Sequence, residues 1–212
     1  MSEKLNIKKA ERQVFQAALS DGLWDIVIAG LLLQFAIAPL LSSSLGDFWS
    51  SAVFIPFIVL LMITIWLLRK YIVKPRMGVV KFGKSRVRRL KKFTIVMLAI
   101  NVLTLIIGLV GSFYFDILSG RIMTITLSVT FIAGFSFAAY FLDYPRLYIY
   151  GLLIGIAPYA GEWLYTSYGA PHHGFPIAFG FVSGAILLVA LITFIRFLHS
   201  NPVMLKDTSQ GS

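Results

Sequence analysis

The stretch KPRMGVVKFGKSRVRRLKK, residues 74–92, decides how this chain is organised, because it separates two apolar segments before it from four after it. Nine of its nineteen residues are lysine or arginine. Short connections between membrane helices that carry this much positive charge stay on the cytoplasmic side of a bilayer. The stretch therefore predicts a membrane protein and the direction in which it is inserted.

The composition leads to the same class of protein. Of the 212 residues, 58% are hydrophobic and 13% are charged, and the mean hydropathy is +0.84. Soluble proteins are about 25% charged. No polar block is long enough to form a second folded unit, so we expect a single membrane domain. The chain has no cysteine, which excludes disulfides and cysteine-based metal sites.

Six segments reach the length of about 20 mostly apolar residues that a helix needs to cross a bilayer. We predict spans over residues 23–41, 52–68, 93–113, 122–142, 147–165 and 176–197. With the N-terminus inside, 18 of the 19 Lys and Arg residues are cytoplasmic, and Arg121 alone is outside. The predicted fold class is an all-α, multi-pass integral protein of the cell membrane with six transmembrane helices and both termini in the cytoplasm.

The segments outside these spans complete the predicted organisation. Residues 1–22 combine polar and apolar positions with helical spacing, which predicts an interfacial amphipathic helix on the cytoplasmic side. Ser20-Asp21-Gly22 should end that helix, because serine and aspartate favour cap positions and glycine permits a turn. The membrane domain then covers residues 23–198, with a basic cytoplasmic loop at 69–92 and a cytoplasmic tail at 199–212.

Glu162 is the one clear ionisable group that we identify within a predicted span. Charged groups at such positions are costly and often functional. At about 1.5 Å per residue, Glu162 lies near the outer surface, four residues after Pro158, which should kink its helix. We predict an outward-facing polar pocket for a small solute, formed by Glu162, Tyr159, Tyr165, His172 and His173. Alternatively, Glu162 only reaches the interface beside Trp163.

Small and polar residues within the spans predict where helices meet. Gly151 and Gly155 are four residues apart in the fifth span, and Gly180 and Gly184 repeat this spacing in the sixth. Such pairs let helix backbones approach closely in lipid. Gln34 and Asn101 lie near the middle of the first and third spans, where they can join helices by hydrogen bonds or line a polar path.

The basic loop predicts a second kind of contact. Five cations stand where the third helix begins, at the positive end of its dipole: Arg86, Arg88, Arg89, Lys91 and Lys92. Anionic lipid headgroups would relieve this charge, and an acidic protein partner is the alternative. The net charge of +10 follows from the distribution of charge across the membrane, so we do not expect nucleic acid as a partner.

No span offers a nucleophile together with a base, and the histidines are too few for most metal sites. We therefore expect no catalytic residues, no metal and no cofactor. The first hypothesis is a non-enzymatic membrane protein that binds or passes a small solute, as a transporter or a transporter subunit. The alternative is a membrane scaffold whose basic loop recruits acidic lipid or an acidic partner. A protein partner or a homo-oligomer is compatible with both.

Overall fold

The computed structural model describes residues 21–77, 84–114 and 120–202, and within these ranges the secondary structure is helical, with no strand. The long helices are α2 (Leu23–Leu45), α4 (Phe54–Leu68), α6 (Lys84–Tyr114), α7 (Gly120–Leu142), α8 (Arg146–Tyr168) and α9 (Phe175–Ser200). The short elements are α3 (Asp47–Ala52), the π-helical turn η1 (Arg69–Val73), α5 (Lys74–Met77) and the 3-10 turn η2 (Pro171–Gly174). The predicted interfacial helix, apart from residues 21–22, and most of the tail at 199–212 lie outside the described residues.

The all-helical architecture that the sequence predicts is confirmed for the described residues, and it is consistent with a membrane protein. In the part of the chain that the structure describes, four helices are long and apolar enough to cross a membrane: Leu23–Leu45, Phe48–Arg76, Thr124–Leu142 and Pro171–Ser200. Large apolar side chains remain exposed along them, for example Ile55 and Leu60 on α4 and Phe181 on α9. Exposed apolar surface of this extent is typical of contact with lipid. That α6 and α8 also cross, giving six spans, stays a prediction.

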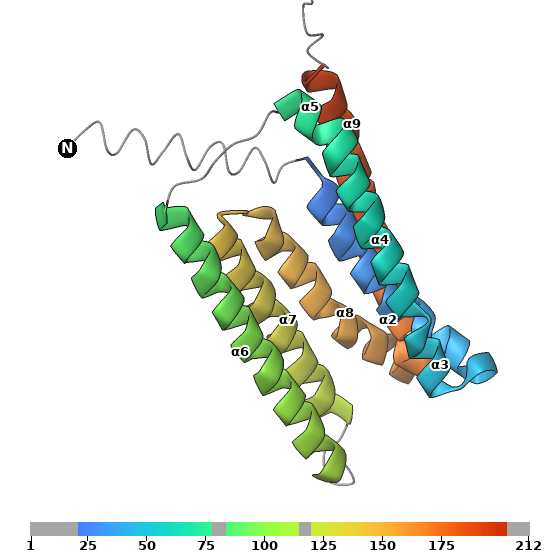
Figure 1. The fold of residues 1–212 in the computed structure, drawn as a ribbon. Helices are drawn as coiled ribbons and strands as arrows, with labels where there is room; N and C mark the ends of the chain where they lie inside the picture. The colour runs from blue at the N-terminus through green and yellow to red at the C-terminus, as the bar shows by residue number, and fades with distance from the viewer. Residues whose placement is uncertain (1–20, 78–83, 115–119, 203–212) are drawn as a thin grey trace, which may run out of the picture.

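The long helices form a bundle in which α8 joins two groups (Figure 1). In one group α2 lies between α9 and α4, and in the other α6 lies along α7. Helix α8 packs on α7 near its start and on α9 near its end. We call one end of the bundle the basic end: α2, α6 and α8 begin there, and α7 and α9 end there.

The centre of the bundle is an apolar core between α2, α8 and α9. Phe179 on α9 is fully buried, and its ring stacks on Phe35 of α2 with a centroid distance of 5.1 Å. The hydroxyl of Ser183 donates a hydrogen bond of 2.8 Å to the carbonyl oxygen of Ala29. This bond joins α9 to α2 and satisfies a polar group that would be costly to leave unpaired in the core.

The segment that we predicted as a loop at 69–92 is largely helical. Helix α4 continues through η1 and α5 to Met77, and α6 already begins at Lys84. Lys and Arg are good helix formers, and the first glycine after the second span is Gly78. The charge pattern predicts a connection between spans, but it does not set where the helices end.

Candidate functional site

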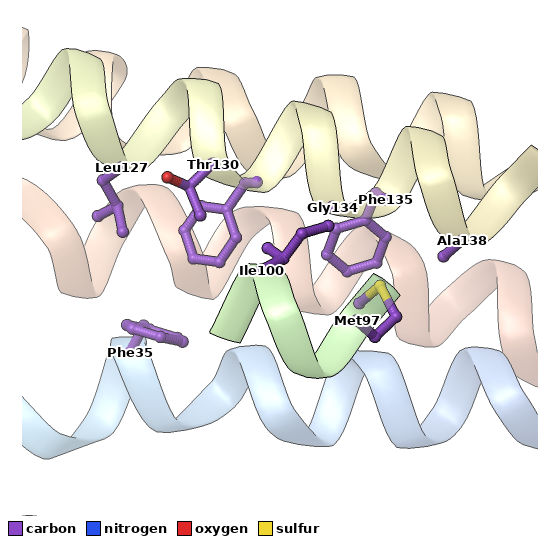
Figure 2. A pocket seen from close by; sticks show the side chains of 9 residues that line it. Phe35, Met97, Ile100, Leu127, Thr130, Gly134, Phe135 and Ala138 are labelled. Atoms are coloured by element: carbon purple, nitrogen blue, oxygen red, sulfur yellow. The ribbon is translucent and has the colours of Figure 1, made fainter. Parts of the chain in front are cut away.

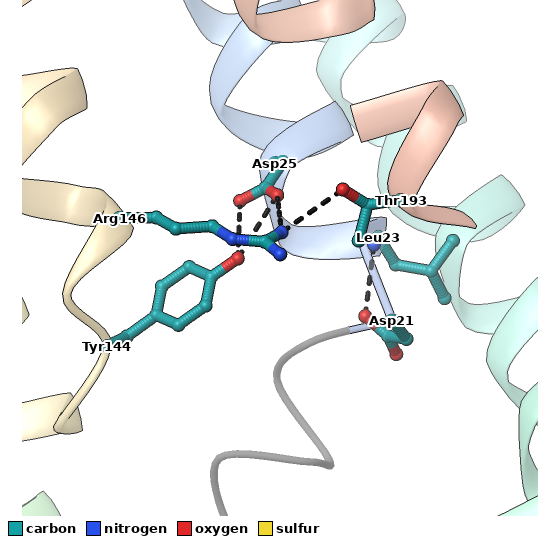
Figure 3. Close-up of polar contacts among 6 residues, drawn as sticks. All are labelled: Asp21, Leu23, Asp25, Tyr144, Arg146 and Thr193. Carbon is teal, nitrogen blue, oxygen red and sulfur yellow. Dashed lines mark hydrogen bonds and ion pairs between the residues drawn. The ribbon is translucent and has the colours of Figure 1, made fainter. Parts of the chain in front are cut away.

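Asp25 is the centre of a buried polar cluster at the basic end (Figure 3). Its side chain is fully buried, in the first turn of α2. The hydroxyl of Tyr144 donates to both carboxylate oxygens, at 3.0 and 3.1 Å. A guanidinium nitrogen of Arg146 lies 3.4 Å from Oδ2. These partners compensate for the desolvation of the carboxylate.

The turn between α7 and α8 brings the partners of Asp25 into place. Asp143 adopts the left-handed conformation with φ of 52°, which reverses the chain so that Tyr144 and Arg146 reach α2. Arg146 also donates a 3.1 Å hydrogen bond to the hydroxyl of Thr193 on α9. The cluster therefore ties three separate parts of the chain together: α2, the α7–α8 turn and α9.

A second buried carboxylate, Asp21, lies just before α2. Its Oδ1 accepts the backbone N–H of Leu23 at 3.0 Å, and its Oδ2 lies 3.6 Å from a guanidinium nitrogen of Arg69 in η1. Arg69 also lies over the ring of Trp24, at 5.4 Å from its centroid. Burial raises the pKa of the Asp21 carboxyl, and the bond from Leu23 and the charge of Arg69 oppose this shift.

Gly22 allows Asp21 to sit this deeply in the bundle. Its φ is +81°, a conformation that residues with a side chain rarely adopt. A Cβ at this position would also lie 2.7 Å from the backbone oxygen of Ala190 on α9. The turn that the sequence predicts at residues 20–22 is therefore present at Gly22, and it is pressed against α9.

A third carboxylate, Asp143, fixes α6. Its Oδ2 lies 2.6 Å from a guanidinium nitrogen of Arg89, which also donates to the carbonyl oxygen of Tyr140. The guanidinium lies 5.3 Å from the centroid of the Tyr140 ring. The three aspartate–arginine pairs thus connect η1, α2, α6 and the α7–α8 turn at the basic end. The hydrogen bond from Arg146 to Thr193 adds α9.

This cluster corrects our statement that Glu162 is the one clear ionisable group in a span. Asp25 lies inside the first predicted span and is more deeply buried than Glu162, whose side chain is 28% exposed. A signal was present in the sequence: the chain has only nine acidic residues, and two of them are four apart where the first apolar segment starts. That spacing places Asp21 and Asp25 one helical turn apart.

An apolar cavity of about 380 Å³ lies between α2, α6 and α7 (Figure 2). Phe35 contributes from α2, and Met97 and Ile100 from α6; the lining residues on α7 are Leu127, Thr130, Phe131, Gly134, Phe135 and Ala138. The volume falls within the range of about 300–1,000 Å³ that small-molecule sites occupy.

The chemistry of the cavity wall is almost purely apolar. Among the lining side chains that the structure describes, Thr130 is the one polar group, and its hydroxyl donates a 2.8 Å hydrogen bond to the carbonyl oxygen of Thr126 in its own helix. Gly134 leaves space in the wall, since a Cβ there would meet no described atom within 4 Å. The cavity can therefore take hydrocarbon, but it offers little to a charged solute.

The predicted outer pocket is assembled only in part, at the end of the bundle opposite the basic end. Nδ1 of His173 lies 3.1 Å from a carboxylate oxygen of Glu162, and the rings of Tyr165 and His173 are 4.4 Å apart. Tyr159 and His172 are exposed, so the group lies at the surface. The structure thus brings together three of the five predicted residues.

Close glycine packing produces the contact between Glu162 and His173. A Cβ on Gly161 would lie 2.9 Å from the backbone oxygen of His173. Gly174 has a positive φ of 63° and packs against the backbone of Gly161. Only residues without side chains let η2 approach α8 so closely. The histidines therefore owe their place beside α8 to two neighbouring glycines that the spacing argument did not select.

The glycines predicted to pack helices behave differently in the two spans. A Cβ on Gly151 would lie 2.6 Å from Cβ of Phe135, and Gly155 likewise lies against Ile132 of α7. For Gly180 the nearest contact is ordinary, at 3.7 Å from Cβ of Ala36, and Gly184 faces open space. Gln34 is half-buried in α2. Asn101 lies in α6, and its side chain is outside the described residues.

The five cations predicted to hold anions occupy the start of α6. The structure pairs Arg89 with Asp143, so this guanidinium already has a carboxylate partner. Arg88, Lys91 and Lys92 are exposed. The side chain of Arg86 lies outside the described residues. Three of the five therefore present their charge at the surface of the basic end.

Comparisons of the chain with protein-family models, with curated proteins and with solved structures found no match. Within residues 21–77, 84–114 and 120–202, no group of three or more His, Cys, Asp or Glu side chains could hold a metal ion. Two features of the described residues stand out: the aspartate–arginine cluster of the basic end and the apolar cavity.

Proposed function

We propose that this protein crosses the cell membrane six times, with both termini and the basic end on the cytoplasmic side. Helices α6 and α8 have 31 and 23 residues, and at about 1.5 Å per residue both exceed a hydrocarbon core of about 30 Å. The starts of α2, α6 and α8 share one end of the bundle, as an even number of spans requires (Figure 1). The cations of that end support a cytoplasmic position.

We propose further that the protein binds a small, largely apolar molecule in the cavity between α2, α6 and α7. The cavity itself carries this proposal, because its volume suits a small ligand and its wall is hydrocarbon. The aspartate–arginine cluster has a supporting role: the pair of Arg89 and Asp143 holds α6 to the α7–α8 turn, and the bonds of Asp25 hold that turn to α2. Each helix that lines the cavity is fixed in this way.

This site replaces the outer pocket as the place where we expect a solute. The Glu162 group is exposed, whereas ligand sites bury most of the surface of their ligand. Binding of an apolar molecule within the membrane is compatible with the first hypothesis from the sequence, a protein that binds or passes a small solute.

Photo-crosslinking tests the proposed binding. Purified protein in nanodiscs of zwitterionic lipid is illuminated with a single-chain fatty alcohol that carries a diazirine, and labelled residues are mapped by mass spectrometry. We expect labels to concentrate on Phe35, Met97 and Phe131. Gly134→Leu should fill the cavity and reduce these labels several-fold. Gly184→Leu is the matched control, because Gly184 also faces open space but lies outside the cavity.

Equal labelling of the parent protein and the Gly134→Leu variant would refute the proposal. So would labels distributed evenly over exposed side chains of α4 and α9, such as Leu60 and Leu188, because they would show that the probe contacts the protein only as bulk lipid does.

Recruitment of an acidic protein partner is the second candidate function, favoured by the exposure of Arg88, Lys91 and Lys92 on α6. If it holds, chemical crosslinking in cells should capture a partner that is lost when these three residues are replaced by glutamine. The Gly134→Leu variant should retain that partner. The reverse pattern would exclude a scaffold role for these cations.

A further inference from the structure

The cavity extends along α7. Its lining residues on α7 run from Leu127 to Ala138, eleven positions apart, which corresponds to about 16 Å at 1.5 Å per residue. Phe35 and Ile100 border it from the neighbouring helices (Figure 2). An apolar space of about 380 Å³ that extends this far along α7 fits a single hydrocarbon chain better than a compact solute.

One end of the cavity points toward the basic end. Ala138 is five residues before Asp143, so the α7–α8 turn lies about 8 Å beyond the cavity along the helix axis. Two arginines meet at this turn: Arg89 reaches it from α6, and Arg146 extends from it toward α2 (Figure 3). Their side chains are 32% and 40% exposed, so each can accept a further anionic partner.

Further exposed positive charge lies at the same end. Helix α6 supplies the exposed side chains of Arg88, Lys91 and Lys92 in its first turns, where the helix dipole is also positive. In the proposed orientation these side chains lie at the level of lipid headgroups. An anion held there would be attracted by all of these charges, and the attraction would weaken with added salt.

We infer that the occupant of the cavity is one acyl chain of an anionic membrane phospholipid, with its phosphate at the α7–α8 turn and the first turns of α6. This inference rests on the proposed function and names the class of its ligand. The apolar wall holds the chain, and the cations of the basic end select the headgroup. A zwitterionic lipid with the same chains has the same hydrocarbon but no net charge, so it should bind less well.

Two photoactivatable lipids with identical diazirine-bearing chains test the inference, one a phosphatidylglycerol and the other a phosphatidylcholine. In nanodiscs at low salt, we expect phosphatidylglycerol to label the cavity residues several-fold more. High salt should remove most of the difference. Substituting Arg88, Lys91 and Lys92 together by glutamine should remove it at low salt. Free glycerol phosphate should not compete, because it lacks the chain.

A matched control variant removes an equal number of positive charges from other positions at the basic end. The control variant carries glutamine at Lys70, Lys74 and Arg196, which are exposed and lie on η1, α5 and α9. It should keep the preference for phosphatidylglycerol. Equal loss in both triple variants would show a general surface potential and overturn the headgroup site.

The outcomes separate the two proposals. Equal labelling by both lipids that Gly134→Leu still suppresses would overturn the anionic-lipid inference and leave the binding function standing. Labelling that Gly134→Leu leaves unchanged for both lipids would overturn the binding function and the inference with it.

Discussion

At the scale of single residues, the basic end depends on carboxylates that are buried and partnered. Asp25 receives hydrogen bonds from Tyr144 and lies beside Arg146, and Asp21 caps the backbone before α2. Removing one partner of such a group leaves a desolvated charge, which is costly. Substituting individual side chains of this cluster should therefore change the free energy of unfolding by a measurable amount.

Removing the hydroxyl of Tyr144 tests how much its hydrogen bonds to Asp25 contribute to stability. Tyr144→Phe removes the donor to Asp25 with little change in shape. We expect the free energy of unfolding to fall by about 1.5–3 kcal/mol, as for hydrogen bonds to charged groups. Tyr148→Phe is the control, because Tyr148 is an exposed tyrosine four residues further on, in the first turn of α8. Equal unfolding midpoints for the two variants in the same detergent would contradict this account.

The carboxyl of Asp21 makes stability depend on pH. Burial raises its pKa in the folded protein above the ordinary value of 3.8, so the folded state holds the proton more tightly than the unfolded state. The stabilisation that the protonated Asp21 carboxyl gives the folded state is complete below the ordinary pKa. It is lost as the pH rises from about 4 through the pKa of the folded protein. Asp21→Asn removes this titration and keeps an acceptor for Leu23.

Thermal unfolding of the parent protein and of Asp21→Asn, measured from about pH 4 upward, checks this prediction. The parent should lose stability relative to the variant as the pH rises. A stability difference between the two that does not change with pH, or that moves in the opposite direction, would show that the ion pair with Arg69 outweighs burial.

At the scale of elements, α7 and α8 pack through positions where the backbones approach. Gly151 faces Cβ of Phe135, an atom that cannot move without its helix, whereas Gly184 on α9 faces open space. The same Gly-x-x-x-Gly spacing in the two helices therefore has different consequences. One copy determines a helix contact, and the other does not.

Substituting alanine at Gly151 and at Gly184 distinguishes the glycine that packs against a neighbouring helix from the one that faces open space. Gly151→Ala should reduce the free energy of unfolding by about 1–3 kcal/mol, the usual cost of overpacking. Gly184→Ala should leave it unchanged or raise it by up to about 1 kcal/mol, because alanine favours helix over glycine. Unfolding in detergent measures both, and a loss of equal size at Gly184 would contradict the packing described here.

At the scale of the whole molecule, the direction of insertion is the property with the widest consequences. Ser44 lies near the end of α2, and Ser85 near the start of α6, at opposite ends of the bundle. Single cysteines at these positions should react from opposite sides of intact cells, with Ser44→Cys labelled from outside. Labelling of Ser85→Cys from outside would invert the proposed topology.

The membrane class and the positions of the long helices can be read from the sequence alone. These follow from properties that are local in the chain, because a run of about 20 apolar residues is sufficient for a helix in a bilayer. Helix ends were less well predicted: residues 69–77 and 84–92 are helical because Lys and Arg tolerate helix as well as loop.

The candidate site, in contrast, depends on how distant parts of the chain fold together. Asp25 and Tyr144 are 119 residues apart, and Asp25 and Arg146 are 121 apart, so no local pattern could pair them. The cavity likewise exists because α2, α6 and α7 meet around Gly134, a residue whose spacing gave no signal. A sequence specifies how apolar each segment is, but contacts between distant segments, and the spaces left between them, depend on how the helices pack.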